Sequence, residues 1–189
     1  MGKFEAKQNG TKVVTGMVRL SYANLFEPRA ANEGQVPKYS VSLIIPKSDT
    51  ATIKAIQAAT EEAKKRDKGK WDGKVPARLK TPLRDGDEDR PDDEAYADSY
   101  FVNANSTTKA PQVVDRYGKS LGSEDVYSGC YARVSLNFYG YNEAGSKGIA
   151  CGLGNVQKLE DGERLGGGFS TAEDDFDFED PLDDDDFLS

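Results

Sequence analysis

The chain has 189 residues, 37% of them hydrophobic, with 25 basic and 33 acidic side chains, two cysteines and no histidine. The absence of histidine removes the commonest metal ligand, the usual general base at neutral pH and every Ser-His or Cys-His nucleophile, and two cysteines are too few for a Cys-rich zinc site. No stretch holds the roughly 18–20 uncharged apolar residues of a membrane helix, and the N-terminus lacks the apolar run of a signal peptide, so we expect one domain with no membrane association, no metal and no cofactor.

The first half of the chain is predicted to form two strands and a helix. Apolar and polar residues alternate over residues 13–21, as in a half-buried strand, and a loop rich in Pro and Gly is expected after it. A second strand is predicted at 39–45. Ser48 or Asp49 then caps a helix that continues to about Arg66, because apolar side chains recur at helical spacing and basic residues occupy its last turn.

The second half is predicted to be rich in strands. Residues 69–98 form a long excursion with little periodicity, apart from a short strand at 77–80. Residues 142–146 have the composition of a hairpin turn between the last two strands. The strands of this half are predicted at residues 100–105, 112–115, 130–141 and 148–157.

These elements predict a mostly β fold with one helix. Five or six strands with a helix after the second fit a small closed or nearly closed barrel. Cys130 and Cys151 are expected to be buried free thiols, because nothing else in the sequence indicates an oxidising compartment. Gly148, Gly152 and Gly154 share one face of the last strand. Either another element approaches the backbone closely there or the strand bends to close the barrel, and we favour the bend.

The strand predicted at 130–141 has two different faces. Its even positions are apolar and belong to the core, whereas its odd positions are aromatic, basic or amide and project to the other side. Nucleic-acid bases stack on aromatic rings at about 1–3 kcal/mol for each base, and Arg and Asn donate to phosphates and base edges without demanding one sequence. The alternative is that tyrosines, which favour strands, pack under loops. The candidates on this face are Tyr131, Arg133, Asn137, Tyr139 and Tyr141.

Two other predicted strands carry similar side chains. Phe101 and Asn103 repeat the aromatic and amide chemistry on the strand at 100–105, and Arg19 offers a cation on the first strand. Tyr22, which follows the first strand, completes this group of candidates. Together with the face of the strand at 130–141, they predict a surface that binds single-stranded nucleic acid.

The basic segment at residues 64–74 holds Lys70 and Trp71. Cations around a flat aromatic ring suit a groove for single strands, and the glycines of this segment would let it close over bound nucleic acid. A solvated helix end, with Trp71 packed against the barrel, explains the same residues equally well.

The C-terminal residues differ in charge from the rest of the chain. Residues 169–189 carry ten Asp and Glu and no Lys or Arg, so the other 168 residues hold 25 basic against 23 acidic side chains. We therefore divide the chain into a body, residues 1–165, and a flexible acidic tail, residues 166–189, punctuated by aromatic side chains. A body with a small excess of basic side chains, tethered to its own polyanionic tail, suggests a protein whose ligand is also a polyanion.

Four segments of the body are specific in combination, although each is weak alone: residues 19–28 (RLSYANLFEP), 37–47 (PKYSVSLIIPK), 100–105 (YFVNAN) and 129–141 (GCYARVSLNFYGY). Together they resemble a family of bacteriophage single-stranded DNA-binding proteins. The resemblance covers nearly the whole body. It implies an OB-fold-like barrel without enzymatic activity that coats single-stranded DNA during phage replication and recombination, in the cytoplasm of the infected bacterial host.

The resemblance also implies a role for the tail. In such proteins the tail competes with DNA for the basic groove and docks on replication proteins, such as a polymerase, a helicase or a recombination factor, through its terminal aromatic residue. Here the corresponding partner-binding residues are Asp183, Asp184, Asp185, Asp186 and Phe187, and two further residues follow the aromatic one. Barrels of this type occur as monomers and as dimers, so a homodimer stays open.

Two alternatives come from other classes of protein. The first is a DNA mimic or protein-interaction module that acts through the acidic tail and whose body binds no nucleic acid. The second is a magnesium-dependent nuclease, because hard cations take oxygen ligands. Its candidate ligands lie in one acidic loop: Asp85, Asp87, Glu88, Asp89, Asp92, Asp93 and Glu94.

Overall fold

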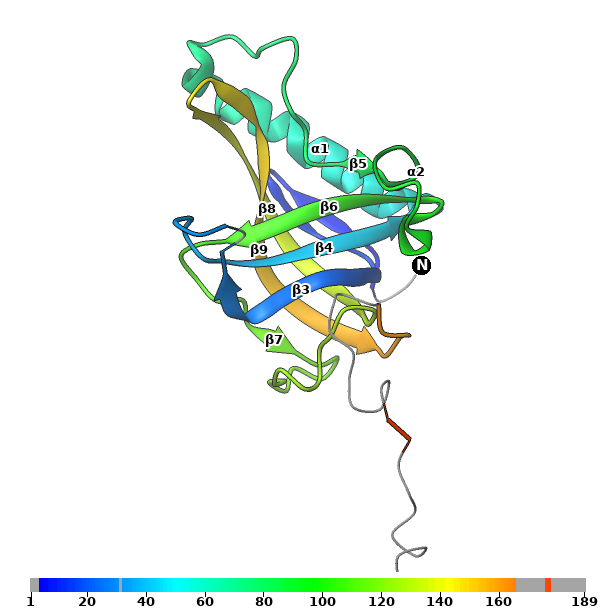
Figure 1. Ribbon diagram of the computed structural model, residues 1–189. Coiled ribbons are helices and arrows are strands. Elements are labelled where there is room, and N and C mark those ends of the chain that lie inside the picture. The colour runs from blue at the N-terminus through cyan, green and yellow to red at the C-terminus, as the bar shows by residue number, and fades with distance from the viewer. Residues whose placement is uncertain (1–3, 31, 166–175, 178–189) are drawn as a thin grey trace, which may run out of the picture.

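The structure is a computed structural model that describes residues 4–30, 32–165 and 176–177 (Figure 1). Its helices are α1 (Thr50–Arg66) and α2 (Gly86–Asp89), with the 3-10 turns η1 (Lys68–Trp71) and η2 (Glu94–Tyr96). Its strands are β1 (Lys7–Asn9), β2 (Lys12–Val14), β3 (Val18–Arg29), β4 (Lys38–Pro46), β5 (Arg84–Asp85), β6 (Ser99–Ser106), β7 (Val113–Val114), β8 (Tyr131–Glu143) and β9 (Ser146–Glu160).

Five of the strands close into a ring. β3 pairs with β4, β4 with β6, β6 with β9 and β9 with β8, and β8 returns to β3. Every pairing in the ring is antiparallel except that of β6 with β9, which run parallel and meet at Asn105 and Gly152. β1 and β2 extend the sheet beyond β8, and β7 extends it beyond β9. The predicted small barrel with one main helix is therefore confirmed.

The interior of the barrel is filled by alternate residues of the strands. On β8, Val134, Leu136 and Phe138 are at most 1% exposed, so the even positions of this strand form core as predicted. Both cysteines, Cys130 and Cys151, are buried free thiols among these side chains. Removing this apolar surface from water is the main contribution to stability.

The helix α1 begins and ends where the sequence predicts. The Asp49 side chain accepts a hydrogen bond from the backbone N–H of Thr52 at 3.2 Å, which satisfies one of the unpaired donors of the first turn. Basic residues occupy the last turn. Ile56 and Ala63 are fully buried where the helix packs against the barrel. Among the described residues, no helix is long and apolar enough to cross a membrane.

β8 and β9 are longer than the other strands and form an arm that extends beyond the ring (Figure 1). They stay paired from Tyr131 with Glu160 to Glu143 with Ser146. Ala144 and Gly145 make the turn, both with positive φ, at 49° and 84°, the conformation of a tight two-residue hairpin. The predicted hairpin is confirmed, and its strands are longer than the alternation indicated.

The first predicted strand differs from the observed ones. Residues 13–21 are divided between β2 and β3, because the chain changes direction near Gly16, whose N–H donates to a side chain of α1 at 3.0 Å. β3 then continues to Arg29, where the sequence predicts a loop. A bulge at Tyr22, which has a positive φ of 48°, interrupts the pairing with β4 and allows the strand to continue.

The excursion after α1 covers part of the barrel. The short strand predicted at 77–80 is not formed, and Lys80 makes a single bridge with Gly148 instead. β5, α2 and η2 fold over the outward face of β4 and β6. There the buried ring of Tyr96 meets Phe101 edge-on, with 5.1 Å between centroids, and its hydroxyl donates to Ser42 Oγ at 2.9 Å.

Candidate nucleic-acid interface

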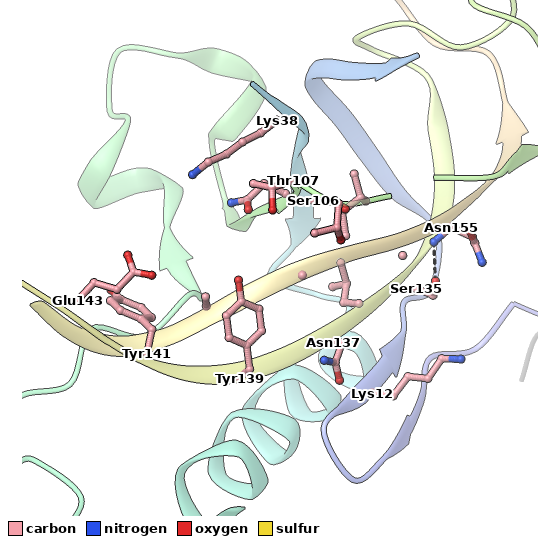
Figure 2. A pocket seen from close by; sticks show the side chains of 17 residues that line it. Lys12, Lys38, Ser106, Thr107, Ser135, Asn137, Tyr139, Tyr141, Glu143 and Asn155 are labelled. Atoms are coloured by element: carbon pink, nitrogen blue, oxygen red, sulfur yellow. Dashed lines mark hydrogen bonds between the residues drawn. The ribbon is translucent and has the colours of Figure 1, made fainter. Parts of the chain in front are cut away.

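A groove of about 910 Å³ runs along the outward face of β8 and β9 (Figure 2). β8 contributes a row of side chains, whereas β9 contributes mostly glycine, alanine and backbone. Residues from the start of β4 and the end of β6 form the opposite wall, and Lys12 of β2 completes the lining. The groove thus lies on the face of β8 that the sequence predicts to be functional.

Two aromatic rings dominate one end of the groove. Tyr139 and Tyr141 project into it from alternate positions of β8 (Figure 2). In the β8–β9 register their partners are Ala150 and Gly148, so the neighbouring strand carries no bulky side chain beside either ring. The Tyr141 hydroxyl lies over Gly148, 2.6 Å from where a Cβ would stand, and the Tyr139 ring lies 3.5 Å from the same position at Gly152, so both rings pack along the backbone of β9. Burial raises the pKa of the Tyr139 hydroxyl above its ordinary value.

Polar and basic side chains line the rest of the groove. Asn137 continues the row of β8, and the Thr11 hydroxyl donates to its Oδ1 at 3.0 Å, which leaves the amide NH2 as a donor. Lys12 and Lys38 lie on opposite sides of the β8–β9 ribbon (Figure 2). Glu143 lies beyond Tyr141 at the aromatic end. Cations beside a row of rings and amides suit a single strand, because the cations attract its phosphates and its unpaired bases can stack on the rings.

The other two candidates of β8 lie on the same face but are covered by neighbouring segments. Arg133 donates to the backbone carbonyl of Glu5 at 3.1 Å, and its burial lowers the pKa of the guanidinium. Arg19 lies 5.7 Å from the centre of the Tyr131 ring and donates to the Glu163 carbonyl at 2.6 Å. Tyr131, Arg133 and Arg19 are therefore held by the N-terminal segment and by the residues that follow β9.

Trp71 lies behind the strand, whereas Lys70 lies at its edge, with Nζ 5.9 Å from the centre of the Tyr139 ring. The Trp71 side chain is 3% exposed, and its Nε1 donates to the Tyr141 carbonyl at 3.0 Å. Lys70 Nζ donates to the Gly140 carbonyl at 2.7 Å. Of the two explanations of the basic segment, packing of the tryptophan against the barrel matches the structure. Both residues support the strand that carries Tyr139.

The remaining candidates lie on the β3, β4 and β6 side of the barrel. Phe101 is 1% exposed beneath η2, so its ring offers no open face. Asn103 is exposed on the same face of β6. Tyr22 is 51% exposed on the bulge of β3, with the Arg90 guanidinium 5.2 Å from its ring centre. None of these three lines the groove.

Several groove residues were not among the sequence candidates. Lys12 belongs to a hairpin that pairs with β8, and Lys38 begins β4, so each reaches the groove only through strand pairing.

Two glycines of β9, Gly152 and Gly154, also line the groove. Of the two explanations of the glycines, the structure favours close approach at Gly154 and Gly148: an added Cβ at Gly154 would lie 2.3 Å from Ser135 Oγ, and one at Gly148 would lie 2.6 Å from the Tyr141 hydroxyl and 2.7 Å from a backbone oxygen. Close approach by neighbouring atoms therefore requires glycine at these two positions.

The acidic loop of the nuclease alternative uses its carboxylates internally. Lys47 Nζ lies 3.0 Å from Asp85 and 2.9 Å from Asp87, and this contact lowers the pKa of Asp87. Asp89 accepts from Arg84 at 2.8 Å. Among the described residues, no group of three or more His, Cys, Asp or Glu side chains is placed to hold a metal ion.

Comparison with known proteins agrees with this architecture. The family model of the single-stranded DNA-binding protein of Enterobacter phage Enc34 matches residues 11–188. A protein of Acyrthosiphon pisum secondary endosymbiont phage 1, named putative protein p50, is 32% identical over 177 residues, which cover 88% of this chain and 92% of that protein.

Solved structures show the same fold. The single-stranded DNA-binding protein of bacteriophage Enc34 in complex with single-stranded DNA has a TM-score of 0.74 and 27% identity, over 88% of this chain and 100% of that one. Gp2.5, a single-stranded DNA-binding protein of bacteriophage T7, has a TM-score of 0.59 and 18% identity, over 91% and 96% of the two chains. Because its identity is only 18%, the comparison with gp2.5 shows a shared fold alone.

The ring of five strands with one main helix is therefore the OB-like barrel of phage single-stranded DNA-binding proteins. This is a class of binding proteins and not of enzymes. Within that class, the chain belongs to the family represented by the single-stranded DNA-binding protein of Enterobacter phage Enc34.

Proposed function

We propose that this protein binds single-stranded DNA in the β8–β9 groove, with little preference for sequence, and coats it during phage replication and recombination in the host cytoplasm. The observation that carries the proposal is the pairing of Tyr139 and Tyr141 with the small residues Ala150 and Gly148, in a groove that Lys12 and Lys38 also line. The Enc34 relative, whose complex with single-stranded DNA is known, supports it.

Binding combines two physical contributions. Bases stack on the tyrosine rings, at about 1–3 kcal/mol for each base, and any base has a face that can stack. Lys12 and Lys38 neutralise phosphates and release counterions, so affinity falls with salt, by a slope of about −0.7 for each phosphate neutralised on a single strand. A duplex keeps its bases stacked inside, so it gains only the neutralisation of its phosphates.

The acidic tail supplies a switch in this proposal. Residues 183–187, which lie outside the described residues, belong to a segment with ten carboxylates and no cation. Tethering gives this polyanion a high effective concentration near the lysines of the groove. It occupies the groove weakly when DNA is absent, and DNA displaces it, which frees Phe187 and its neighbouring aspartates for a polymerase, a helicase or a recombination factor.

A salt titration tests both parts. Fluorescence anisotropy of labelled oligothymidylate and of a duplex is measured at several salt concentrations, for the full chain and for a variant lacking residues 169–189. We expect single strands to bind more tightly than duplex at every salt concentration, and the truncated protein to bind more tightly than the full chain at low salt. Equal or weaker binding by the truncated protein contradicts the switch.

A matched variant separates charge from length. Replacing the four aspartates at 183–186 by asparagine keeps the length of the tail and should reproduce part of the gain in affinity, because the competitor loses charge. If the body without its tail binds no oligonucleotide at all, the alternative of a module acting only through its acidic tail is favoured instead.

A further inference from the structure

The groove does not end at Ser135. A second hollow of about 220 Å³ shares Lys12, Ser135 and Asn155 with the first and continues along β8 and β9 toward Arg133 and Gln157. Arg133 and Gln157 are partners in the β8–β9 register, so the second hollow lies on the same outward face. None of the eight described residues that line it is acidic.

The side chain of Phe4 lies close to two cations, Arg133, which lines this hollow, and Arg116. The centre of its ring is 5.7 Å from the guanidinium carbon of Arg133 and 5.9 Å from that of Arg116. Arg133 also holds the segment through the Glu5 carbonyl. Arg116 is anchored separately, because its Nη2 donates to the Leu159 carbonyl at 2.8 Å. The two cations belong to the barrel, whereas the ring belongs to the N-terminal segment.

This arrangement is one that a nucleobase can occupy in place of the phenyl ring. Guanidinium groups attract the face of an aromatic ring, and arginines contribute in the same way to single-strand grooves. Phe4 is only partly buried and Glu5 is exposed. Because the Phe4 ring is still partly exposed to solvent, its contacts with the two guanidinium groups are weak enough for a competing base and its phosphate to replace.

We propose that Phe4 is a displaceable plug on the single-strand track, and that Lys12, Arg116 and Arg133 form a second subsite for nucleotides of a longer single-stranded DNA. The inference rests on the proposed function, since it extends the groove already assigned to DNA. Continuity with that groove and the uniformly positive charge of the subsite identify single-stranded DNA as the occupant. A short strand fills the aromatic groove alone, and a longer one displaces Phe4.

A length series with Phe4→Ala tests the plug. Dissociation constants are measured for oligothymidylates from about 4 to about 16 nucleotides, the range of site sizes of OB folds. We expect Phe4→Ala to bind the longest oligonucleotides about three- to fivefold more tightly than the unchanged protein, because they no longer displace a ring, and to bind the shortest ones equally. Arg133→Gln should weaken binding of the long strands and spare the short ones. Met17→Ala, which removes an exposed apolar side chain between β2 and β3, is the matched control.

A second variant keeps the test decisive if Phe4→Ala disturbs folding. Phe4→Cys places a thiol at the plug, while the two natural cysteines are buried. We expect long oligonucleotides to accelerate its reaction with a thiol reagent and short ones to leave the rate unchanged. Equal rates with both lengths, or weaker binding of both lengths by Phe4→Ala, overturn the plug. Failure of every oligonucleotide to bind any variant contradicts the proposed function itself.

Discussion

Asp67 accepts a hydrogen bond of 2.7 Å from the backbone N–H of Gly140, beyond the residues at which β8 pairs with β2. Lys70 Nζ donates to the carbonyl of the same glycine at 2.7 Å. Trp71 covers its other side, where an added Cβ would lie 2.7 Å from the indole. The end of α1 and η1 therefore take the place of a neighbouring strand along this edge. Because Gly140 separates Tyr139 from Tyr141, the placement of both rings depends on these three side chains, and Asp67 supplies the only carboxylate among them.

Asp67→Asn should destabilise the protein by about 2 kcal/mol at neutral pH. The hydrogen bond from Arg66, followed by that from Gly140, lowers the pKa of Asp67 to about 2, against 3.8 ordinarily, and a shift of one pKa unit corresponds to about 1.4 kcal/mol. The folded-state pKa is depressed, so this stability is present above about pH 4 and is lost as the pH falls through about 2.

Urea unfolding of both proteins at several pH values measures this difference. We expect the gap in the free energy of unfolding to close as the pH falls from about 4 to about 2, because protonation then removes the same charge from the unchanged protein. Asp72→Asn, the same change at an exposed position five residues along, is the matched control and should have little effect. A gap that does not depend on pH would show that the charge of Asp67 contributes nothing.

The two tyrosines of the groove should contribute to binding through their rings. Tyr139→Ala and Tyr141→Ala are each expected to weaken binding to oligothymidylate by at least about fivefold, the lower end of the value of one base stack. Tyr139→Phe should retain most of the affinity, because a phenyl ring stacks without the hydroxyl. The effect should persist at high salt, since stacking releases no counterions.

Tyr117→Ala is the control for this pair of variants. Tyr117 is 87% exposed on the turn after β7 and does not line the groove. Its loss should leave the dissociation constant unchanged. If Tyr117→Ala and Tyr139→Ala weaken binding equally, the groove of β8 and β9 is not the site of stacking.

Periodicity was sufficient for the parts of the fold that alternate regularly. The core face of β8, the start of α1 at Asp49 and the hairpin between β8 and β9 follow from local sequence, because each depends on spacing or on a cap within a few residues. The same alternation placed Asn137, Tyr139 and Tyr141 on the groove face. At these positions the local sequence pattern and the tertiary structure agree on which side chains face the core and which face the groove.

The alternation of apolar and polar residues shows which side chains of a strand point away from the core. It could not indicate which of these side chains another segment covers. Phe101 points outward from β6, as its position requires, yet η2 buries it because Tyr96 returns to the sheet from the excursion. Arg133 likewise points outward and is covered by Phe4, far away in the sequence. Lys38 reaches the groove only because strands distant in the chain close the ring. These contacts are long-range, and no window of sequence contains both partners.

The two cysteines should be inert in the folded protein. Burial raises the pKa of both the Cys130 and the Cys151 thiol, and neither side chain is more than 2% exposed. Because the thiolate is the reactive form, reaction with a thiol reagent should follow global unfolding and not proceed from the native state. The rate in increasing urea is the measurement, and rapid labelling without denaturant would contradict the closed barrel around these residues.

Gly152 tests whether DNA bases approach the bare backbone of β9. An added Cβ would lie 3.2 Å from the carbonyl oxygen of Asn137 and 3.5 Å from the Tyr139 ring, so a larger side chain must project into the groove. Gly152→Val should therefore weaken oligothymidylate binding by about tenfold or more, the loss of roughly one stacked base, and the midpoint of thermal unfolding, measured alongside, separates this loss from an effect on stability. Gly122→Val, in an exposed loop with nothing closer than 3.8 Å to its added Cβ, is the control. Unchanged binding by Gly152→Val would place the bases away from β9, and the path of the strand would then have to follow the rings of β8 alone.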